Sequence, residues 1–252
     1  MQRTRPLIRP CVGALAAVAL SAALAGCLAD TGDGGILVLR NIHPDTSCVG
    51  TGLDSEPTRS SGTIELAVPS SYVFFAQMKS RITALTGQED QRTIITTGAK
   101  VDIAFPNSTV FSDTELAQLK SSGLTHFESL FSQVIKPGGT SDAAFTLIPE
   151  ALVRQVAAKA VTSGFSLDAV ATFTVEGQMA GSKVTSQVFN YPVTLGLGRV
   201  VNVLGTCPLP KGTMVTHTGY VCNLFQDGVI DCCTNGTGAA QTLTCPATVA
   251  AQ

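Results

Sequence analysis

The stretch ATFTVEGQMAGSKVTSQVFNYPVTL, residues 171–195, decides the fold class. Over residues 171–176, and again over residues 189–195, every second side chain is apolar. A period of two places these side chains on one face of a strand that is half buried. The short turn sequence at residues 180–183 lies between the two segments and predicts that they are neighbouring strands of a hairpin. Pro192 lacks a backbone N–H, so we expect the second strand at a sheet edge or beside a bulge.

Further strand-like segments with plentiful β-branched residues occur on the N-terminal side of this hairpin. Apolar residues form a run at 36–39, and they alternate with other residues at 63–68, 101–105 and 145–147. About eight strands separated by turn residues predict two antiparallel sheets packed face to face. The expected fold is therefore mainly β, an antiparallel, immunoglobulin-like β-sandwich with one or two short helices and a disulfide-stapled C-terminal tail.

Two segments have helical signatures. Ser112 and Glu115 have the spacing of a capping box, which favours a short helix from this point. Pro149 and Glu150 open the second segment, whose apolar residues share one helical face as core packing requires. The connection at residues 122–140 is predicted as an extra helix or a binding loop.

The composition excludes one class of partner. Only 13% of the 252 residues are charged, and the formal net charge is −2. Such a chain has no overall basic field that could hold a nucleic-acid backbone or an anionic membrane surface, and we expect no nucleic-acid partner. The hydrophobic fraction of 44% is that of a globular protein.

The N-terminus has the layout of an export signal. Three arginines within the first nine residues precede an uncharged apolar run at 12–25, which is shorter than the roughly 20 residues that span a bilayer. The run ends in Leu-Ala-Gly-Cys at residues 24–27. This tetrapeptide resembles the lipobox of bacterial lipoproteins, in which the cysteine is acylated and becomes the new N-terminus. The resemblance implies a signal peptide at residues 1–26, lipidation of Cys27 and a tether at 27–35.

The residue after the lipobox cysteine bears on the destination of the protein. Lipoproteins that stay at the inner membrane commonly carry Asp at this position, whereas this chain has Leu28. The resemblance thus implies a lipid-anchored protein of the outer membrane. Two or three acyl chains hold a domain at a membrane without help from the fold.

Cysteines dominate the C-terminal part of the mature chain. We expect a sandwich domain at residues 36–204 and a tail at 205–252 that is rich in Gly and Pro and has little regular structure. An even number of cysteines in an exported chain favours disulfides, although 15 pairings are open. Two adjacent cysteines cannot easily bond to each other. Five of the six cysteines lie in the tail, so one tail cysteine must pair with the cysteine that lies outside it. The six candidates are Cys48, Cys207, Cys222, Cys232, Cys233 and Cys245.

Metal binding is the rival use of this region. A zinc site is not expected, because no Cys-x-x-Cys pair is present and the histidines are scattered. A weak calcium pattern starts at Asn223 and continues with Asp227 and Asp231. It lacks the acidic ligands of positions three and twelve, so a tight turn at Asp227–Gly228 is the favoured alternative.

Several motifs occur together in a characteristic order. After the lipobox come Ser-Ser-Tyr-Val at 70–73, a helix that begins at a proline, Phe-Asn-Tyr-Pro-Val at 189–193, and Cys-x₄-Asp-Gly-x₂-Asp-Cys-Cys at 222–233. This order resembles a family of bacterial outer-membrane lipoproteins whose activity is uncharacterised. The resemblance covers most of the mature chain and offers no activity to carry over. We expect no cofactor and no catalytic residues.

The sequence favours a non-catalytic role. It contains no Gly-x-Ser-x-Gly, His-Glu-x-x-His or phosphate-binding glycine loop. We therefore expect a structural or binding module at the cell envelope, with a membrane attachment and an envelope protein or glycan as partner. The alternative is a secreted hydrolase, which would place His126 or His217 against a carboxylate and a hydroxyl in a buried cleft.

Overall fold

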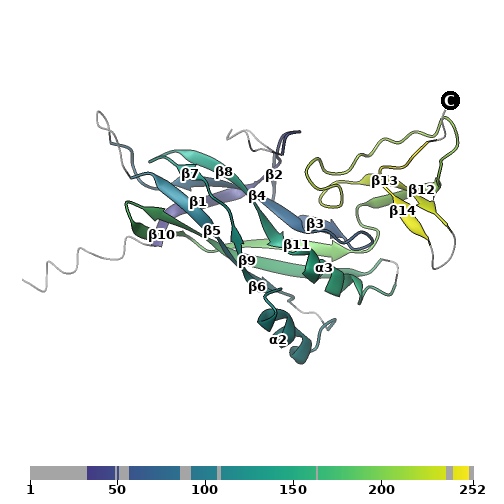
Figure 1. Ribbon diagram of the computed structural model, residues 1–252, viewed down its shortest axis with the longest axis horizontal. Coiled ribbons are helices and arrows are strands. Elements are labelled where there is room, and N and C mark those ends of the chain that lie inside the picture. Colours follow the sequence, from purple (N-terminus) through teal and green to yellow (C-terminus); the bar gives the residue numbers. More distant parts are fainter. Residues whose placement is uncertain are drawn as a thin grey trace, which may run out of the picture.

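The structure is a computed structural model that describes residues 33–48, 50, 57–85, 92–106, 109–162, 164–236 and 241–249. Within these residues the chain is mainly β, and its elements fall into a large sandwich and a small tail sheet (Figure 1). The sandwich comprises β1 (Asp33–Ile42), β2 (Thr58–Arg59), β3 (Gly62–Glu65), β4 (Tyr72–Ser80), β5 (Ile94–Ala104), α2 (Asp113–Ser121), β6 (His126–Leu130), β7 (Val134–Ile135), β8 (Thr140–Ile148), α3 (Glu150–Ala157), β9 (Ser166–Met179), β10 (Ser182–Ser186) and β11 (Phe189–Gly196). The tail sheet comprises β12 (Val201–Thr206), β13 (Ile230–Asn235) and β14 (Thr242–Thr244).

The sandwich has two layers that are joined along one edge. In one layer β1 pairs with β4 and β4 pairs with β8, all antiparallel. In the other layer β9 pairs antiparallel with β5 on one side and with β10 and β11 on the other. The layers meet where β1 pairs with β10, and this pair is parallel, as are β3–β11 and β12–β13. The predicted antiparallel β-sandwich is confirmed, with these three parallel pairs added.

Aromatic side chains from both layers fill the core. The ring of Phe74 on β4 lies 5.1 Å from that of Phe173 on β9 and 4.9 Å from that of Tyr191 on β11, centroid to centroid. Phe145 on β8 also packs against Phe173, at 5.2 Å. Phe74, Phe173 and Tyr191 are almost completely buried. Edge-to-face contacts of this kind add to the hydrophobic stabilisation that comes from burial.

The hairpin predicted from residues 171–195 is present, and its second arm is divided into β10 and β11. Ala180 and Gly181 form the turn, both with positive φ. Both parts of this second arm lie on the edge of β9 that β5 leaves free. Between β10 and β11, the side-chain amide of Gln187 takes the place of a backbone hydrogen-bond partner for Val38 in β1. It donates to the Val38 carbonyl oxygen at 2.8 Å. Pro192 lies one residue before the pairing of β11 with β3 begins, so its missing N–H removes no bond to β3.

Two expectations need correction, and one strand was not predicted. The connection at 122–140 is neither a helix nor a binding loop, because β6 and β7 within it complete the second edge of β5. The first strand begins earlier than predicted, at Asp33 and not at residue 36, and it pairs with β10 from there. The strand β4 escaped notice because nearly all of its residues are buried, which removes the alternation that marks a half-buried strand.

Both predicted helices are confirmed. Ser112 caps α2, and the capping box is complete: Glu115 Oε2 accepts from the Ser112 backbone N–H at 2.8 Å, and Ser112 Oγ accepts from the Glu115 N–H at 3.4 Å. The helix α3 follows Pro149 and buries its apolar face against the core through Leu152, Val153 and Val156. Among the described residues no helix is long and apolar enough to cross a bilayer.

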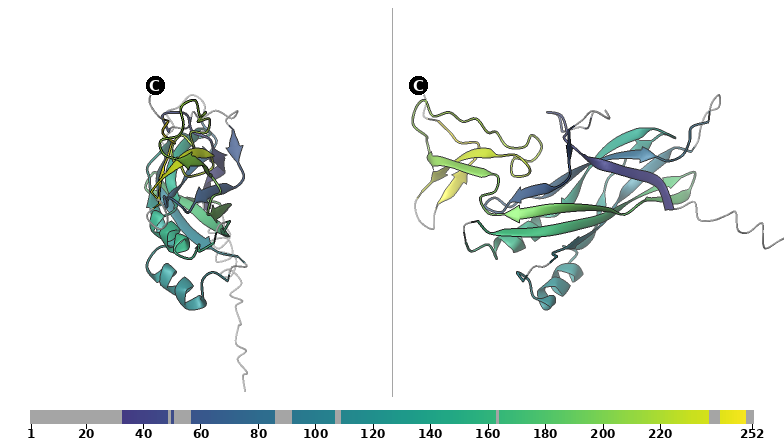
Figure 2. Two further views of the ribbon diagram at one scale, coloured as in Figure 1. Left: turned by 90° about the vertical axis from the view of Figure 1, so that its right-hand side faces the viewer. Right: turned by 180° about the vertical axis from the view of Figure 1, so that it is seen from behind.

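The tail has more regular structure than expected. The parallel pair β12–β13 and the antiparallel pair β13–β14 form a sheet, and β12 runs through the boundary expected at residue 204. Figure 2 shows this sheet at one end of the molecule and the N-terminal end of β1 at the other. The tail strands are short and are flanked by Gly and Pro residues, so the sequence pattern did not indicate them.

Candidate functional site

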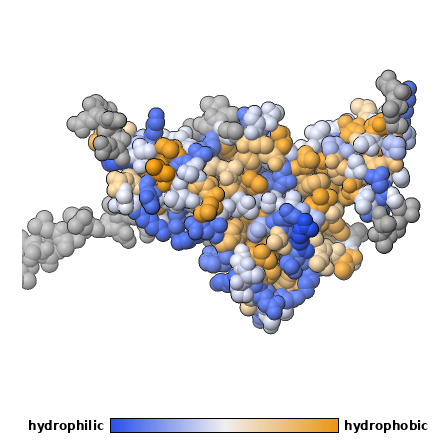
Figure 3. Space-filling model, viewed as in Figure 1, coloured by the Kyte–Doolittle hydropathy of each residue, from blue (hydrophilic) through white to orange (hydrophobic). Residues whose placement is uncertain are grey.

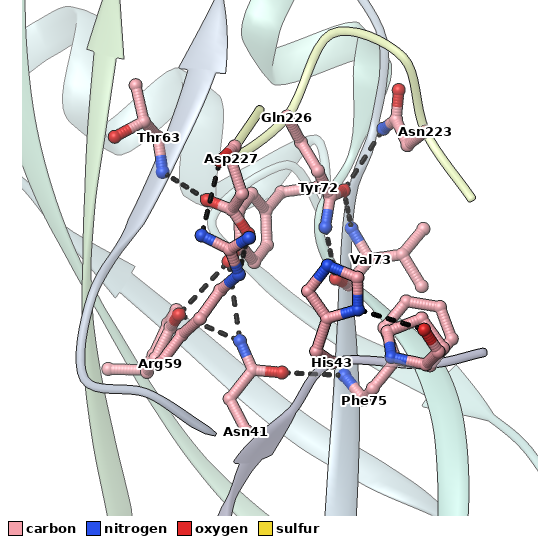
Figure 4. A network of polar contacts seen from close by, with 12 residues as sticks. Asn41, His43, Arg59, Thr63, Tyr72, Val73, Phe75, Asn223, Gln226 and Asp227 are labelled. Carbon is pink, nitrogen blue, oxygen red and sulfur yellow. Dashed lines mark hydrogen bonds and ion pairs between the residues drawn. The ribbon is translucent and has the colours of Figure 1, made fainter. Parts of the chain in front are cut away.

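A chain of buried hydrogen bonds links the sandwich to the loop before β13 (Figure 4). Asn41 Nδ2 donates to the Tyr191 hydroxyl at 2.7 Å, and the two tyrosine hydroxyl oxygens are 3.1 Å apart. The hydroxyl of Tyr72 donates to Asp227 Oδ2 at 2.7 Å. Because Tyr72 donates to Asp227, Tyr191 donates to Tyr72, so the hydrogen bonds run in the direction from Asn41 to Asp227. Asn41 Nδ2 also donates to the Tyr72 hydroxyl directly, at 3.4 Å. Bonds in such a chain polarise one another and strengthen the whole.

Asp227 is the acceptor at the end of this chain. Its side chain is 2% exposed, and Oδ1 accepts the backbone N–H of Thr63 at 2.7 Å. Arg59 Nε lies 3.8 Å from Oδ2. Burial raises the pKa of Asp227, although the bonds from Thr63 and Tyr72 and the charge of Arg59 oppose the rise. Burial and the nearby carboxylate raise the pKa of Tyr72 well above its ordinary value. A phenol that keeps its proton is a permanent donor to Asp227.

The guanidinium of Arg59 also holds the tail loop. Its Nη1 donates to the backbone carbonyl of Asp227 at 3.2 Å, and its Cζ lies 5.1 Å from the centre of the Tyr220 ring. Tyr220 in turn packs edge-on against His43 and near Phe75. A cation over an aromatic face adds electrostatic attraction to the contact.

Two side-chain amides from the same loop extend the docking onto β4. Gln226 accepts the Val73 N–H and donates to the Val73 carbonyl, both at 2.9 Å, so its amide acts as one residue of an added strand. Asn223 Nδ2 donates to the carbonyl of Ser71. Figure 4 shows Asn223, Gln226 and Asp227 pointing from the loop toward the sandwich.

A second buried carboxylate fixes the connection between β11 and β12. The side chain of Glu65 is completely buried and accepts six backbone N–H groups. Two come from the residues that follow it, and four come from residues 198–201 at distances of 2.8 to 3.3 Å. A cradle of backbone N–H groups compensates a buried negative charge without a cation. Glu65 therefore organises the segment from which the tail sheet begins.

All six candidate cysteines are paired in disulfides. Cys48 bonds to Cys222, with Cα atoms 5.4 Å apart, and this bond ties the tail to the segment after β1. Within the tail Cys207 bonds to Cys233 and Cys232 bonds to Cys245, with Cα separations of 5.2 and 4.5 Å. The adjacent cysteines thus take different partners, and the tail cysteine that pairs with Cys48 is Cys222, as the sequence required of one tail cysteine.

The three weak calcium candidates point to different partners. Asn223 and Asp227 bind β4 and the β3 region, as described above. Asp231 is 1% exposed and accepts the backbone N–H groups of Thr216 and His217 and the side-chain amide of Asn202. These bonds lower the pKa of Asp231. Each of the three side chains is therefore engaged by protein groups, and the favoured alternative, a tight turn at Asp227 with positive φ, is what the structure has.

The histidines do not form a catalytic triad. His217 Nδ1 lies 3.0 Å from Asp231 Oδ1 and 3.2 Å from Thr216 Oγ1, so carboxylate and hydroxyl meet the same ring nitrogen. In a triad the hydroxyl lies at the opposite nitrogen. His126 Nδ1 contacts Asp102 at 2.6 Å on the surface, where both side chains are more than half exposed. Neither histidine lies in the buried cleft that the hydrolase hypothesis requires.

The predicted lipidation site, Cys27, lies outside the described residues. The sequence pattern missed the main residues of the junction between the sandwich and the tail. Asp227 was predicted only as a turn residue or a weak calcium candidate. Nothing in the spacing of Asn41, Glu65, Tyr72 and Tyr191 signals that they are polar groups of one buried connection. Because these atoms are buried and paired with one another, what the arrangement does chemically is hold the tail sheet in a fixed orientation on the sandwich.

Comparison with known proteins adds a distant likeness. No family model matches the chain, and no curated protein matches it. A solved crystal structure of a protein from Archaeoglobus fulgidus aligns with a TM-score of 0.32 and 12% sequence identity, over 54% of this chain and 93% of that one.

Proposed function

We propose that the chain is a lipid-anchored lipoprotein of the cell envelope, attached to the outer membrane through Cys27, and that it acts as a non-catalytic binding module. The tetrapeptide at residues 24–27 carries the anchoring proposal. The fold supports it, because β1 begins at Asp33, six positions after Cys27. A chain of this length spans at most about 20 Å, so the start of β1 would lie close to the membrane surface.

The position of the tail sheet carries the binding proposal. It lies at the end of the molecule farthest from the start of β1, so an anchor at Cys27 would present it away from the membrane (Figure 2). Polar contacts and a disulfide hold it rigidly on the sandwich. A rigid surface binds a partner with a smaller loss of conformational entropy than a mobile one.

The tail surface has the chemistry of a protein contact. Residues 201–252 contain only three charged side chains, and the two acidic ones, Asp227 and Asp231, are engaged internally. Figure 3 shows hydrophobic side chains on the tail end of the molecule. Depletion of charge and exposure of apolar side chains together mark interaction surfaces. The large apolar residues exposed there are Val203, Met214, Val221, Leu224, Val229 and Val249.

Two measurements test the proposal. Cys27→Ser should leave the precursor unacylated and shift the protein out of the detergent-extracted membrane fraction. A photo-crosslinking residue at Val229 should capture an envelope partner, whereas one at Val161, which is equally apolar and 85% exposed on the sandwich, should not. The binding role would be contradicted by equal capture from both positions, or by turnover of esters, glycosides or peptides that His217→Ala abolishes.

A further inference from the structure

A hollow of 510 Å³ lies beside the start of β1, at the end of the sandwich opposite the tail. It lies between the first residues of β1, the residue after β4, Thr174 of β9, and the end of β10 with the segment that joins it to β11. Its lining combines one cation, Arg81, with hydroxyl groups, a side-chain amide and the apolar Val188, which is 59% exposed. This lining is more polar than the core of the sandwich, and the hollow is open to solvent.

Arg81 is held at this place by its backbone, which leaves its guanidinium available to a ligand. Its N–H donates to the carbonyl of Gly35 at 3.0 Å, which ties it to β1. Its guanidinium lies against Gly34, where a Cβ would come within 3.1 Å of Nη1. Throughout the described ranges, no carboxylate forms an ion pair with this guanidinium.

Two further exposed cations lie at the same end of the sandwich, outside the lining of the hollow. Lys79 is exposed near the end of β4, and Lys136 is exposed in the turn that follows β7. The strand register places both near the start of β1, because Ile36 pairs with Ser80 and Lys79 pairs with Thr140. On the flank of this end, Ile95 and Val134 lie opposite each other on β5 and β7 and are 52% and 55% exposed. Figure 3 shows hydrophobic and hydrophilic side chains interspersed there.

We propose that this hollow binds the phosphate of a membrane phospholipid headgroup, with Arg81 as the cation that contacts it. The inference rests on the proposed lipid anchor, which would hold the start of β1 within about 20 Å of the bilayer. A planar guanidinium matches phosphate geometry, and exposed apolar residues beside basic ones are typical of proteins that contact a membrane surface. The contact would fix the orientation of the sandwich, so that the tail sheet points away from the membrane.

The test uses residues 28–252, the mature chain without Cys27, so that no acyl chain contributes to binding. Co-sedimentation with vesicles of phosphatidylethanolamine and phosphatidylglycerol should show salt-sensitive binding that exceeds binding to phosphatidylcholine vesicles. Arg81→Gln should reduce the partition coefficient about fivefold. The matched control is Arg199→Gln, which removes an exposed arginine at the opposite end and should leave vesicle binding unchanged.

Three outcomes would overturn the inference. One is equal loss of binding in both variants, and another is the absence of vesicle binding by the unacylated chain. The third is a site for the free anion alone, revealed if inorganic phosphate shifts the NMR signals around Arg81 while vesicles do not bind. Failure of the anchor itself is a separate result, since mass spectrometry of the N-terminal peptide reports acylation of Cys27 whatever the headgroup does.

Discussion

The hydroxyl of Tyr72 lies 2.7 Å from the Oδ2 atom of Asp227, although 155 positions separate the two residues in the chain. This bond joins the core of the sandwich to the loop that leads into the tail sheet. It is charge-assisted when Asp227 is ionised, and it is the last step of a hydrogen-bond chain that begins at Asn41. The orientation of the tail therefore depends on a polar contact buried beside the aromatic core.

Tyr72→Phe should lower the free energy of unfolding by about 2 kcal/mol, because Asp227 loses a donor inside the protein. Urea unfolding of the single variants and of Tyr72→Phe with Asp227→Asn gives a double-mutant cycle, for which we expect a coupling energy of about 1 kcal/mol. Tyr191→Phe interrupts the chain one step earlier, at a bond between neutral groups, and should cost less. Strict additivity of Tyr72→Phe and Asp227→Asn would show that the bond contributes nothing.

Glu65→Gln should destabilise the protein by about 3 kcal/mol or more, because an amide NH₂ would face backbone N–H donors that now meet a carboxylate oxygen. Hydrogen exchange of the amides at 198–201 should accelerate before that of the sandwich strands. Glu128→Gln, on an exposed position of β6, is the control and should change neither quantity. Unchanged protection at 198–201 would contradict the role assigned to Glu65.

Asp231 should make the protein less stable in acid. Its pKa in the folded state is lowered, chiefly by the backbone N–H of His217 and then by the amide of Asn202. A lowered folded-state pKa stabilises the fold above the unfolded-state pKa of about 3.9, and this contribution is lost as the pH falls through the lowered value. Asp231→Asn should therefore lose less stability than the wild type between neutral and acidic pH, as measured by thermal unfolding.

Asp227 should have the opposite effect, since burial raises its folded-state pKa. Its contribution to the free energy of unfolding is fully present below the unfolded-state pKa and is lost as the pH rises through the raised value.

For the Asp231→Asn experiment, Asp168→Asn at an exposed position of β9 controls for the loss of one carboxyl group. An acid dependence of Asp231→Asn equal to that of the wild type would contradict the assignment to Asp231.

Removing the Cys48–Cys222 disulfide with paired serine substitutions should lower the free energy of unfolding by about 2 to 4 kcal/mol, because the bond closes a loop of 174 positions in the unfolded chain. The loop contacts of Asn223, Gln226 and Asp227 should keep the tail in place. Full reduction should do more, opening the tail to limited proteolysis while the sandwich persists. Cleavage that begins within the sandwich strands would contradict this order.

Periodicity in the sequence was sufficient to predict the fold class and several of its elements. Alternation at 171–176 and 189–195 predicted strands that the structure contains, because a half-buried strand must place apolar residues on one face. The capping box at Ser112 is equally local, since its two hydrogen bonds join residues three positions apart. The requirement that Cys48 pair with a tail cysteine followed from the odd number of cysteines in the tail, which leaves one of them without a partner there.

Tertiary structure alone decided what joins the two sheets. Glu65 meets residues more than 130 positions later, and Tyr72 meets Asp227 across 155, so no local spacing connects them. Polar residues also occur beside them in the sequence and stay on the surface. Only tertiary packing selects which polar residues are buried and must be paired. The strand β4 was hidden for the related reason that burial on both faces removes its alternation. Composition and periodicity thus specify the elements, whereas long-range burial specifies their polar connections.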